Sequence, residues 1–303
     1  MGKWITTLEQ FRQALRIHGG VFSLCAAALA VRLSRVPIPT KRLRLRVFRA
    51  IYGKKYAPLN ETESECPLWA YRSFNALFTR GLRPESRPIP HSPDQILAPC
   101  DGTVQDIGTV EHEKIVTVKG VEYTIASLLA GTGAESFNGG RFAIIFLSPT
   151  DCHRVFSPLD GQLEGLIHVP GYRLLVHPPF QKKEFPPYSL NERVILRLRT
   201  PQGACALILV AGWGVGNITL RMERDYRPKW RRLTAKNYDP PKLVSRGDWI
   251  ATFELGSTAI LIAERGIVCC PWVGPNEKVN YGQPLFEVRR DAPRSGDGNG
   301  SLG

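Results

Sequence analysis

The stretch Phe-Glu-Leu-Gly-Ser-Thr-Ala-Ile-Leu, residues 253–261, has the composition of a buried β-strand but places Gly-Ser-Thr in its middle. Glycine weakens a strand because it leaves the backbone without a Cβ atom. Gly256 therefore marks either a plain β-bulge or a carbonyl that another group can approach closely. Because Ser257 supplies a hydroxyl directly after that carbonyl, the pattern permits attack by Ser257 on its own preceding peptide bond.

The residues around this stretch predict a mainly β body. Short runs of β-branched and aromatic residues, bounded by glycine and proline, recur from residue 96 to about residue 290. The runs that we expect to be strands are 115–118, 142–147, 194–198, 206–210, 249–253, 258–263 and 284–288. Short strands separated by turn signals are typical of antiparallel sheets. Residues 291–303, rich in glycine and polar residues, are expected to form a disordered tail.

The first 60 residues have a different composition. They carry twelve Lys and Arg against the single acid Glu9, in a chain whose formal net charge is +13. Apolar residues at spacings of three and four predict helix over 4–56, and a second short helical pattern covers Tyr71–Leu82. The expected fold class is α+β, with a mainly antiparallel β body preceded by a helical, basic N-terminal region.

The apolar run of this region, Val21–Val31, is too short to span a bilayer. As a helix it would reach about 16 Å, against a hydrocarbon core of about 30 Å. Basic residues mixed with Leu, Val and Phe at 41–49 suit a helix lying in an anionic membrane interface. A cleaved secretory signal ending near Ala26–Ala30 is the alternative. Nucleic-acid binding has no supporting motif.

The seven cysteines are an odd number, and no two form a C-x-x-C pair. This pattern suggests neither a disulfide framework nor a zinc site, and it fits a reducing, cytoplasmic setting.

Three further places carry residues of chemical interest. Asp101 precedes a glycine at a turn into a strand, although Asp-Gly is also a common plain turn. Asp151 and His153 leave the end of an apolar strand, where polar side chains are held rigidly. The glycines of 211–217 do not follow the G-x-G-x-x-G spacing, so we expect close strand packing there rather than a phosphate loop.

Taken together, these segments resemble the phosphatidylserine decarboxylase family of self-processing, pyruvoyl-dependent enzymes. The resemblance runs from about Tyr71 to Val288 through separated matches in the same order. The matching segments are Tyr-Arg-Ser-Phe-Asn-Ala-Leu-Phe-Thr-Arg-Gly-Leu-Arg-Pro-Glu-Ser-Arg-Pro-Ile (71–89), Ala-Pro-Cys-Asp-Gly (98–102), Leu-Ser-Pro-Thr-Asp-Cys-His-Arg-Val (147–155), Val-Pro-Gly (169–171), Asn-Glu-Arg-Val (191–194), Leu-Gly-Ser-Thr (255–258) and Gly-Gln-Pro-Leu (282–285).

This resemblance implies a chemistry for Ser257. The family serine attacks the preceding glycine carbonyl, and the resulting ester decays to an N-terminal pyruvoyl group, so Ser257 would become the cofactor. The chain would split after Gly256 into a β chain, 1–256, and an α chain starting at 257. The pyruvoyl group would form a Schiff base with phosphatidylserine and yield phosphatidylethanolamine and CO₂, without pyridoxal phosphate or metal.

The resemblance also implies roles for Asp101 and His153. Asp101 matches the family aspartate that orients a histidine base for self-cleavage, and His153 matches a histidine linked to decarboxylation. The position of the base itself holds Phe156, whose ring cannot accept a proton. Either His153 or His168, the second slightly favoured, could replace that base. A core histidine bonded to the backbone is the other interpretation of His168.

The sequence therefore predicts a membrane-associating arm at 1–60, a decarboxylase domain at 61–290 and the tail at 291–303. The protein would act peripherally at the cytoplasmic side of the cell membrane, as β and α chains of one proenzyme and, by family analogy, as a dimer. One alternative is a relative that acts on a different serine lipid or amino acid. Another is a processing-incompetent lipid-binding relative, because of Phe156. A lipoyl- or biotinyl-type carrier module lacks an evident attachment lysine.

Overall fold

A computed structural model describes residues 20–55, 58–117, 120–131, 133–176, 186–200, 203–212, 217–223, 232–265 and 267–288. The helix expected over 4–19, the glycines within 213–216 and the tail at 291–303 lie outside these residues.

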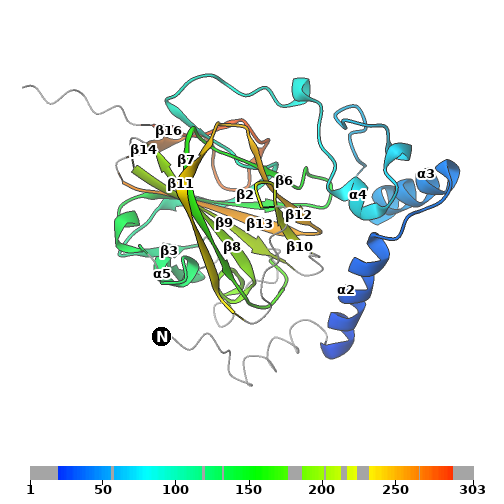
Figure 1. Cartoon of the computed structure of the whole chain (residues 1–303), viewed down its shortest axis with the longest axis horizontal. Coiled ribbons are helices and arrows are strands. Elements are labelled where there is room, and N and C mark those ends of the chain that lie inside the picture. Colours follow the sequence, from blue (N-terminus) through cyan, green and yellow to red (C-terminus); the bar gives the residue numbers. More distant parts are fainter. Residues whose placement is uncertain are drawn as a thin grey trace, which may run out of the picture.

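The centre of the body is an eight-stranded sheet (Figure 1). Its strands lie in the order β11 (Thr234–Val244), β7 (Gly161–Val169), β8 (Arg193–Thr200), β9 (Gly203–Ala211), β13 (Ser257–Ala263), β5 (Arg141–Leu147), β2 (Gly102–Thr109) and β15 (Lys278–Val279). Each neighbouring pair is antiparallel. The expected α+β class with a mainly antiparallel body is confirmed.

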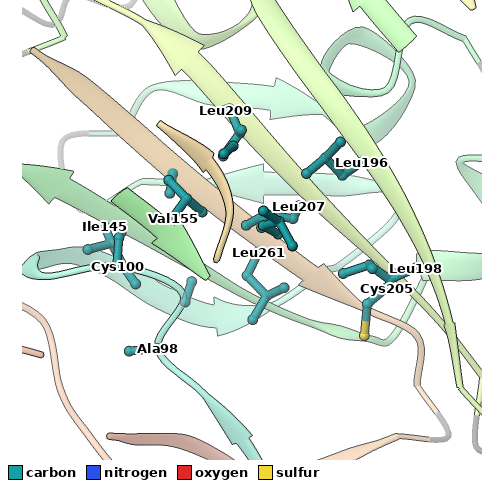
Figure 2. Packing of buried hydrophobic residues seen from close by; sticks show 14 of the residues in the cluster. Ala98, Cys100, Ile145, Val155, Leu196, Leu198, Cys205, Leu207, Leu209 and Leu261 are labelled. Atoms are coloured by element: carbon teal, nitrogen blue, oxygen red, sulfur yellow. The ribbon is translucent and has the colours of Figure 1, made fainter. Parts of the chain in front are cut away.

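The middle strands of this sheet are apolar on both faces. Along β9, Leu207 and Leu209 point into one core, whereas Ile208 and Val210 point into a second core on the opposite face. Figure 2 shows Leu207 and Leu209 packed with Leu261 of β13 in the first core. Burial on both faces explains why these segments read as continuous apolar runs rather than as alternating ones.

Smaller elements cover the two faces. The first core is closed by two three-stranded sheets, β10 (Asn217–Leu220), β12 (Trp249–Glu254) and β6 (Arg154–Phe156), and β1 (Gln95–Leu97), β16 (Pro284–Val288) and β14 (Val268–Pro271). The second core is closed by β3 (Lys114–Val116), β4 (Glu122–Thr124), α5 (Ile125–Leu128), η4 (Glu135–Phe137) and α6 (Pro187–Leu190). The seven predicted strands correspond to β3, β5, β8, β9, β12, β13 and β16.

The described part of the basic arm is not one continuous helix. It forms α2 (Gly20–Ser34), α3 (Lys41–Ala50) and the short π-helix η1 (Ile51–Lys55), which lie to one side of the β body (Figure 1). Two prolines, Pro37 and Pro39, interrupt the helical pattern between α2 and α3. Thr40 then caps α3, its hydroxyl accepting the N–H of Leu43.

The link from this arm into the body is made by η2 (Leu68–Ala70), α4 (Phe74–Phe78) and η3 (Pro84–Ser86). α4 covers only part of the helical pattern predicted over Tyr71–Leu82. Phe48 of α3 packs with Leu68, Tyr71 and Leu77 in a small core of its own. No helix in the described ranges is long and apolar enough to cross a membrane.

Candidate active site

The segment 253–261 contains the end of one strand, a tight link and the start of the next strand, in agreement with the predicted runs 249–253 and 258–263. β12 ends at Glu254 and β13 begins at Ser257. Between them, Leu255 and Gly256 have φ angles of 73° and 60°, in the left-handed region. Glycine adopts this region freely, but for Leu255 it costs about 1–2 kcal/mol. The backbone is therefore strained beside the Gly256–Ser257 peptide bond.

Ser257 is fully buried, and its hydroxyl is unpaired. It lies opposite Leu147 of β5 on one side and Ala211 of β9 on the other. Because side chains alternate along a strand, Ser257 faces the first core, as Ala259 and Leu261 do. Within the described part of the chain, no group bonds to Ser257 Oγ. A buried hydroxyl without a partner is costly, which makes Ser257 a functional candidate.

The carbonyl of Gly256 faces the amide of Gly212, at the end of β9. The N–H of Gly212 donates to the Gly256 oxygen over 3.4 Å. A Cβ atom at position 212 would lie 2.9 Å from Val176 Cγ2 and 3.3 Å from that oxygen, so a glycine permits this approach. Gly212 thus packs closely against the link that precedes β13, whereas the other glycines of 211–217 lie outside the described residues. An N–H at this oxygen can stabilise negative charge that develops there.

Asn191 fixes the strand end that carries Gly212. Its buried side-chain amide donates to the carbonyls of Ala211 and Leu174, at 2.8 and 2.9 Å, and its Oδ1 accepts the N–H of Leu174 at 2.9 Å. Gly171 permits this packing, because a Cβ there would lie 2.5–2.6 Å from backbone atoms of residues 190–192. The matched segments Val-Pro-Gly and Asn-Glu-Arg-Val therefore pack on each other beside Ser257.

The candidate residues gather at one edge of the large sheet. At this edge β2, β13 and β8 begin, at Gly102, Ser257 and Arg193, and β5, β9 and β7 end, at Leu147, Ala211 and Val169. The structure thus places Asp101 on one side of Ser257 and His168 on the other. The N–H of Ala211 donates to the Glu192 carbonyl, so two inter-strand spacings, about 10 Å, separate the backbones of Ser257 and Glu192.

His168 forms a buried pair with Glu192. Its Nε2 lies 3.1 Å from Glu192 Oε1, and Arg173 donates to Oε2 at 2.9 Å. Burial raises the pKa of Glu192, but the hydrogen bonds and charges of His168 and Arg173 outweigh burial, and the net pKa is lowered. The ionised carboxylate favours the proton on Nε2, which leaves Nδ1 as an acceptor. No described group bonds that Nδ1. The partner of His168 is a side-chain carboxylate, not the backbone.

Asp101 is bound by an arginine. Nε and Nη2 of Arg87 donate to its two oxygens at 3.1 and 2.7 Å, and the N–H of Tyr281 donates at 2.8 Å. Phe156, at the expected position of the base, stacks on the Tyr281 ring with centroids 3.8 Å apart. Among the hydrogen bonds of the described residues, none joins Asp101 to an imidazole. This carboxylate is therefore part of an ion pair next to an aromatic stack.

His153 is fully buried beyond the end of β5. Its ring lies 3.9 Å from the Phe78 ring, and its Nδ1 lies 3.0 Å from the carbonyl of Asp151. Burial and the positive charge of Arg80 lower the pKa of His153 to about 3, although the bond to Asp151 opposes the shift. The imidazole is thus neutral, and its Nε2 has no hydrogen-bond partner among the residues described.

Comparison with known proteins places the chain. A family model described as phosphatidylserine decarboxylase matches residues 74–287. A phosphatidylserine decarboxylase proenzyme of Anaeromyxobacter sp. (strain K) is 35% identical over 271 residues, which cover 87% of this chain and 93% of that protein. The chain belongs to the phosphatidylserine decarboxylase family. A second member, the proenzyme of Halorhodospira halophila, is 32% identical over 299 residues, 94% of this chain and 96% of its own length. The resemblance read from the motifs is confirmed.

Within this family fold, the sequence motifs missed several residues that build the edge around Ser257. Glu192 and Asn191 belong to a segment that the resemblance matched, but nothing along the chain shows that they contact His168 and Ala211. Arg87 also falls in a matched segment, and its bond to Asp101 follows only from folding. Among the described residues, no group of three or more His, Cys, Asp or Glu is arranged to hold a metal ion.

Proposed function

We propose that this member of the family is a phosphatidylserine decarboxylase proenzyme, which cleaves itself between Gly256 and Ser257 and then converts phosphatidylserine to phosphatidylethanolamine and CO₂. The observation that carries the proposal is the strained Leu255–Gly256 link in front of a buried, unpaired Ser257 hydroxyl. Nucleophile and carbonyl are adjacent in the chain, so their approach costs little entropy.

Self-cleavage would begin with attack of Ser257 Oγ on the carbonyl carbon of Gly256. The Oγ–H proton passes to a base, and negative charge develops on the carbonyl oxygen, to which Gly212 donates. The C–N bond then breaks, and the amide nitrogen takes up a proton, which leaves an ester between Gly256 and Ser257. Removal of the Ser257 Cα proton expels the Gly256 carboxylate, and addition of water with loss of ammonia gives the pyruvoyl group.

We assign the base of the first step to His168. Glu192 orients its ring and stabilises the protonated form, as the carboxylate does in a Ser-His-Asp arrangement. The Nδ1 of His168, which has no hydrogen-bond partner among the described residues, is the acceptor that this role requires. His153 is a weaker base, because its pKa is lowered to about 3. In this proposal Asp101 positions Arg87 and Tyr281 rather than a base.

The residues around Ser257 fit a pyruvoyl group, because the site is buried and the side chain at 257 has no competing partner in the described structure. Such a group supplies an electron sink for decarboxylation without pyridoxal phosphate or a metal ion. At this buried position, the carbonyl of the pyruvoyl group would be shielded from water. Neutral, buried His153 is the residue to which we assign proton handling during decarboxylation.

We further propose that residues 1–60 associate with an anionic membrane surface, residues 61–290 form the catalytic domain and 291–303 form a tail. Leu29 and Leu33 of α2 and Val36 after it are more than half exposed, and α3 carries five basic residues, Lys41, Arg42, Arg44, Arg46 and Arg49. Exposed apolar side chains next to basic ones suit binding at the cytoplasmic face of the membrane. The β and α chains would stay together, as one copy or as a dimer.

A denaturing gel of the purified protein tests this function. Wild type should run as two fragments, the smaller starting with a blocked residue at 257, whereas Ser257→Ala should stay whole. Ser136→Ala, an exposed serine, is the matched control and should cleave normally. Cleaved protein should release CO₂ from phosphatidylserine vesicles.

Phe156 at the base position is the specific observation that favours a second function, a processing-incompetent lipid-binding relative. A wild-type chain that stays whole would support it. Cleavage without CO₂ release from phosphatidylserine would point to a different serine lipid or amino acid as the substrate.

A further inference from the structure

A polar cavity of about 220 Å³ lies where the N-terminal arm meets the body. It is lined by residues from five places along the chain, and they include Asn60, Arg80, Arg87, Asp151 and Lys278. Asn60 is the last residue of the arm, Arg80 follows α4, Asp151 lies in the turn after β5, and Lys278 starts β15. None of these residues belongs to the cleavage step described above.

Two of the charged side chains in the cavity wall already have partners. Arg87 binds both oxygens of Asp101, and it also donates to Glu63 and to the Ser86 carbonyl. Asp151 accepts the N–H of Ser148 at 2.7 Å, and burial raises the pKa of its carboxyl group. Within the described structure, none of the carboxylates that line the cavity forms an ion pair with the remaining buried cation.

That cation is Arg80, and most of its guanidinium is unsatisfied. The residue is only 4% exposed, and Nη2 donates to the carbonyl of Thr150 at 2.7 Å. Its Nε and Nη1 have no hydrogen-bond partner in the described structure. A buried charge with unpaired donors is expensive unless an opposite charge meets it. A phosphate group can supply that opposite charge and accept hydrogen bonds from these donors.

We propose that Arg80 is the anchor of a site for a phosphate-class oxyanion, namely the phosphodiester of the phospholipid headgroup. This assignment rests on the proposed function. The cavity shares Asp101 and Asp151 with the candidate active site, and the charge of Arg80 acts on buried His153. Its outer wall continues into the arm, where the Tyr52 hydroxyl donates to the Pro149 carbonyl, beside Thr150. A lipid on the arm would thus present its headgroup to this cavity.

The phosphodiester is a better ligand for Arg80 than the serine carboxylate. A guanidinium on the carboxylate would stabilise the charge that decarboxylation must remove, which would raise the barrier. The phosphodiester keeps its charge throughout the reaction, so its bond to Arg80 is equally strong in substrate and transition state. Such uniform binding lowers KM and leaves kcat unchanged.

The first test is steady-state kinetics of Arg80→Gln and Arg80→Lys on short-chain phosphatidylserine, after a gel has shown that each variant is cleaved. Arg80→Gln should raise KM about 10- to 100-fold with kcat within threefold of wild type, because a charged hydrogen-bond pair is lost. The KM of Arg80→Lys should lie between those of wild type and Arg80→Gln. Arg83→Gln, an exposed arginine of the same segment, is the matched control. An unchanged KM in cleaved Arg80→Gln overturns the site.

A second test does not need cleavage. The uncleaved Ser257→Ala protein should gain thermal stability with sn-glycero-3-phosphoserine and with inorganic phosphate, and Ser257→Ala/Arg80→Gln should gain none from either. A shift with inorganic phosphate alone would assign the cavity to free phosphate and reject the headgroup. No shift with either ligand would reject the site. A wild-type chain that never cleaves would instead count against the proposed function, whatever these shifts are.

Discussion

Ser257 lies between two buried carboxylates that have opposite surroundings. On the β2 side, Asp101 is held by Arg87 and by the N–H of Tyr281, next to the Phe156 ring. On the β8 side, Glu192 is held by Arg173 and by His168, whose second nitrogen is free in the described structure. In the described structure, only the second cluster contains an imidazole, the side chain that can act as a general base here. The comparison teaches that a carboxylate at the expected position does not by itself make a catalytic pair.

The difference between the two clusters is tested most directly by removing the imidazole on the Glu192 side and introducing one on the Asp101 side. His168→Ala should slow self-cleavage about 10²- to 10⁴-fold, the usual contribution of a general base. Phe156→His in the same chain should restore much of the rate, because its imidazole would take the place of the ring next to Asp101. The half-time of cleavage, followed on denaturing gels, measures both.

The control for this pair is His91→Ala, which removes an exposed histidine and should cleave at the wild-type rate. Normal cleavage of His168→Ala would reject His168 as the base. If His153→Ala alone were slow, the base would be His153.

The next largest effect is expected for Asp101→Asn, which should lower stability without greatly slowing self-cleavage. Asp101→Asn leaves Arg87 with Glu63 as its remaining carboxylate, and breaking a buried pair from one side costs about 3 kcal/mol. Urea unfolding of the uncleaved Ser257→Ala protein should show this loss. The cleavage half-time at low temperature should change less than about threefold, and a hundredfold slowing would mean that Asp101 assists a base directly.

The matching change on the Glu192 side should affect the rate of cleavage more than it affects stability. Glu192→Gln keeps an oxygen for His168 but removes the charge that stabilises its protonated form. Cleavage should slow about 10- to 100-fold, equivalent to roughly 1.4–2.7 kcal/mol of barrier, with a smaller loss of stability than in Asp101→Asn. Glu164→Gln, a half-buried carboxylate of β7 paired with Arg199, is the control. Equal rates in both variants would remove Glu192 from the mechanism.

Strands buried on both faces could be predicted from sequence, because β9 and β13 read as continuous apolar runs. Edge strand β11 could not, since Thr-Ala-Lys-Asn-Tyr-Asp-Pro-Pro-Lys-Leu-Val is polar and contains two prolines. The break between β12 and β13 lies between the predicted runs 249–253 and 258–263, but the left-handed backbone of Leu255 could not be predicted, because leucine rarely adopts it.

The candidate site shows the same limit. Ser257 and the histidines could be named from motifs, whereas the partners of His168 and Asp101 depend on strand register and on loops that fold back across the edge. Residue spacing along the chain does not encode these contacts. Glu192 is 24 residues from His168, and Arg87 is 14 residues from Asp101.

The smallest expected effect concerns His153, and it distinguishes this imidazole from the His168–Glu192 pair through pH. Its pKa of about 3 in the native protein lies below the ordinary value of 6.5, so between these values the unfolded chain binds a proton that the native protein does not. Stability should therefore fall as the pH drops below about 6.5, by at most about 1.4 kcal/mol per pH unit.

The loss of stability that follows from the lowered pKa of Glu192 begins at a lower pH than the loss that follows from His153. Its contribution to stability is present above the ordinary value of 4.5 and is lost only as the pH falls through the lower native pKa. Urea unfolding of uncleaved Ser257→Ala at pH 7 and pH 5 should thus report on His153 rather than on Glu192. The loss between these two pH values should shrink in Ser257→Ala/His153→Gln and persist in Ser257→Ala/Glu192→Gln. Equal losses in all three proteins would show that His153 is not held neutral, and the proton handling assigned to it would fall.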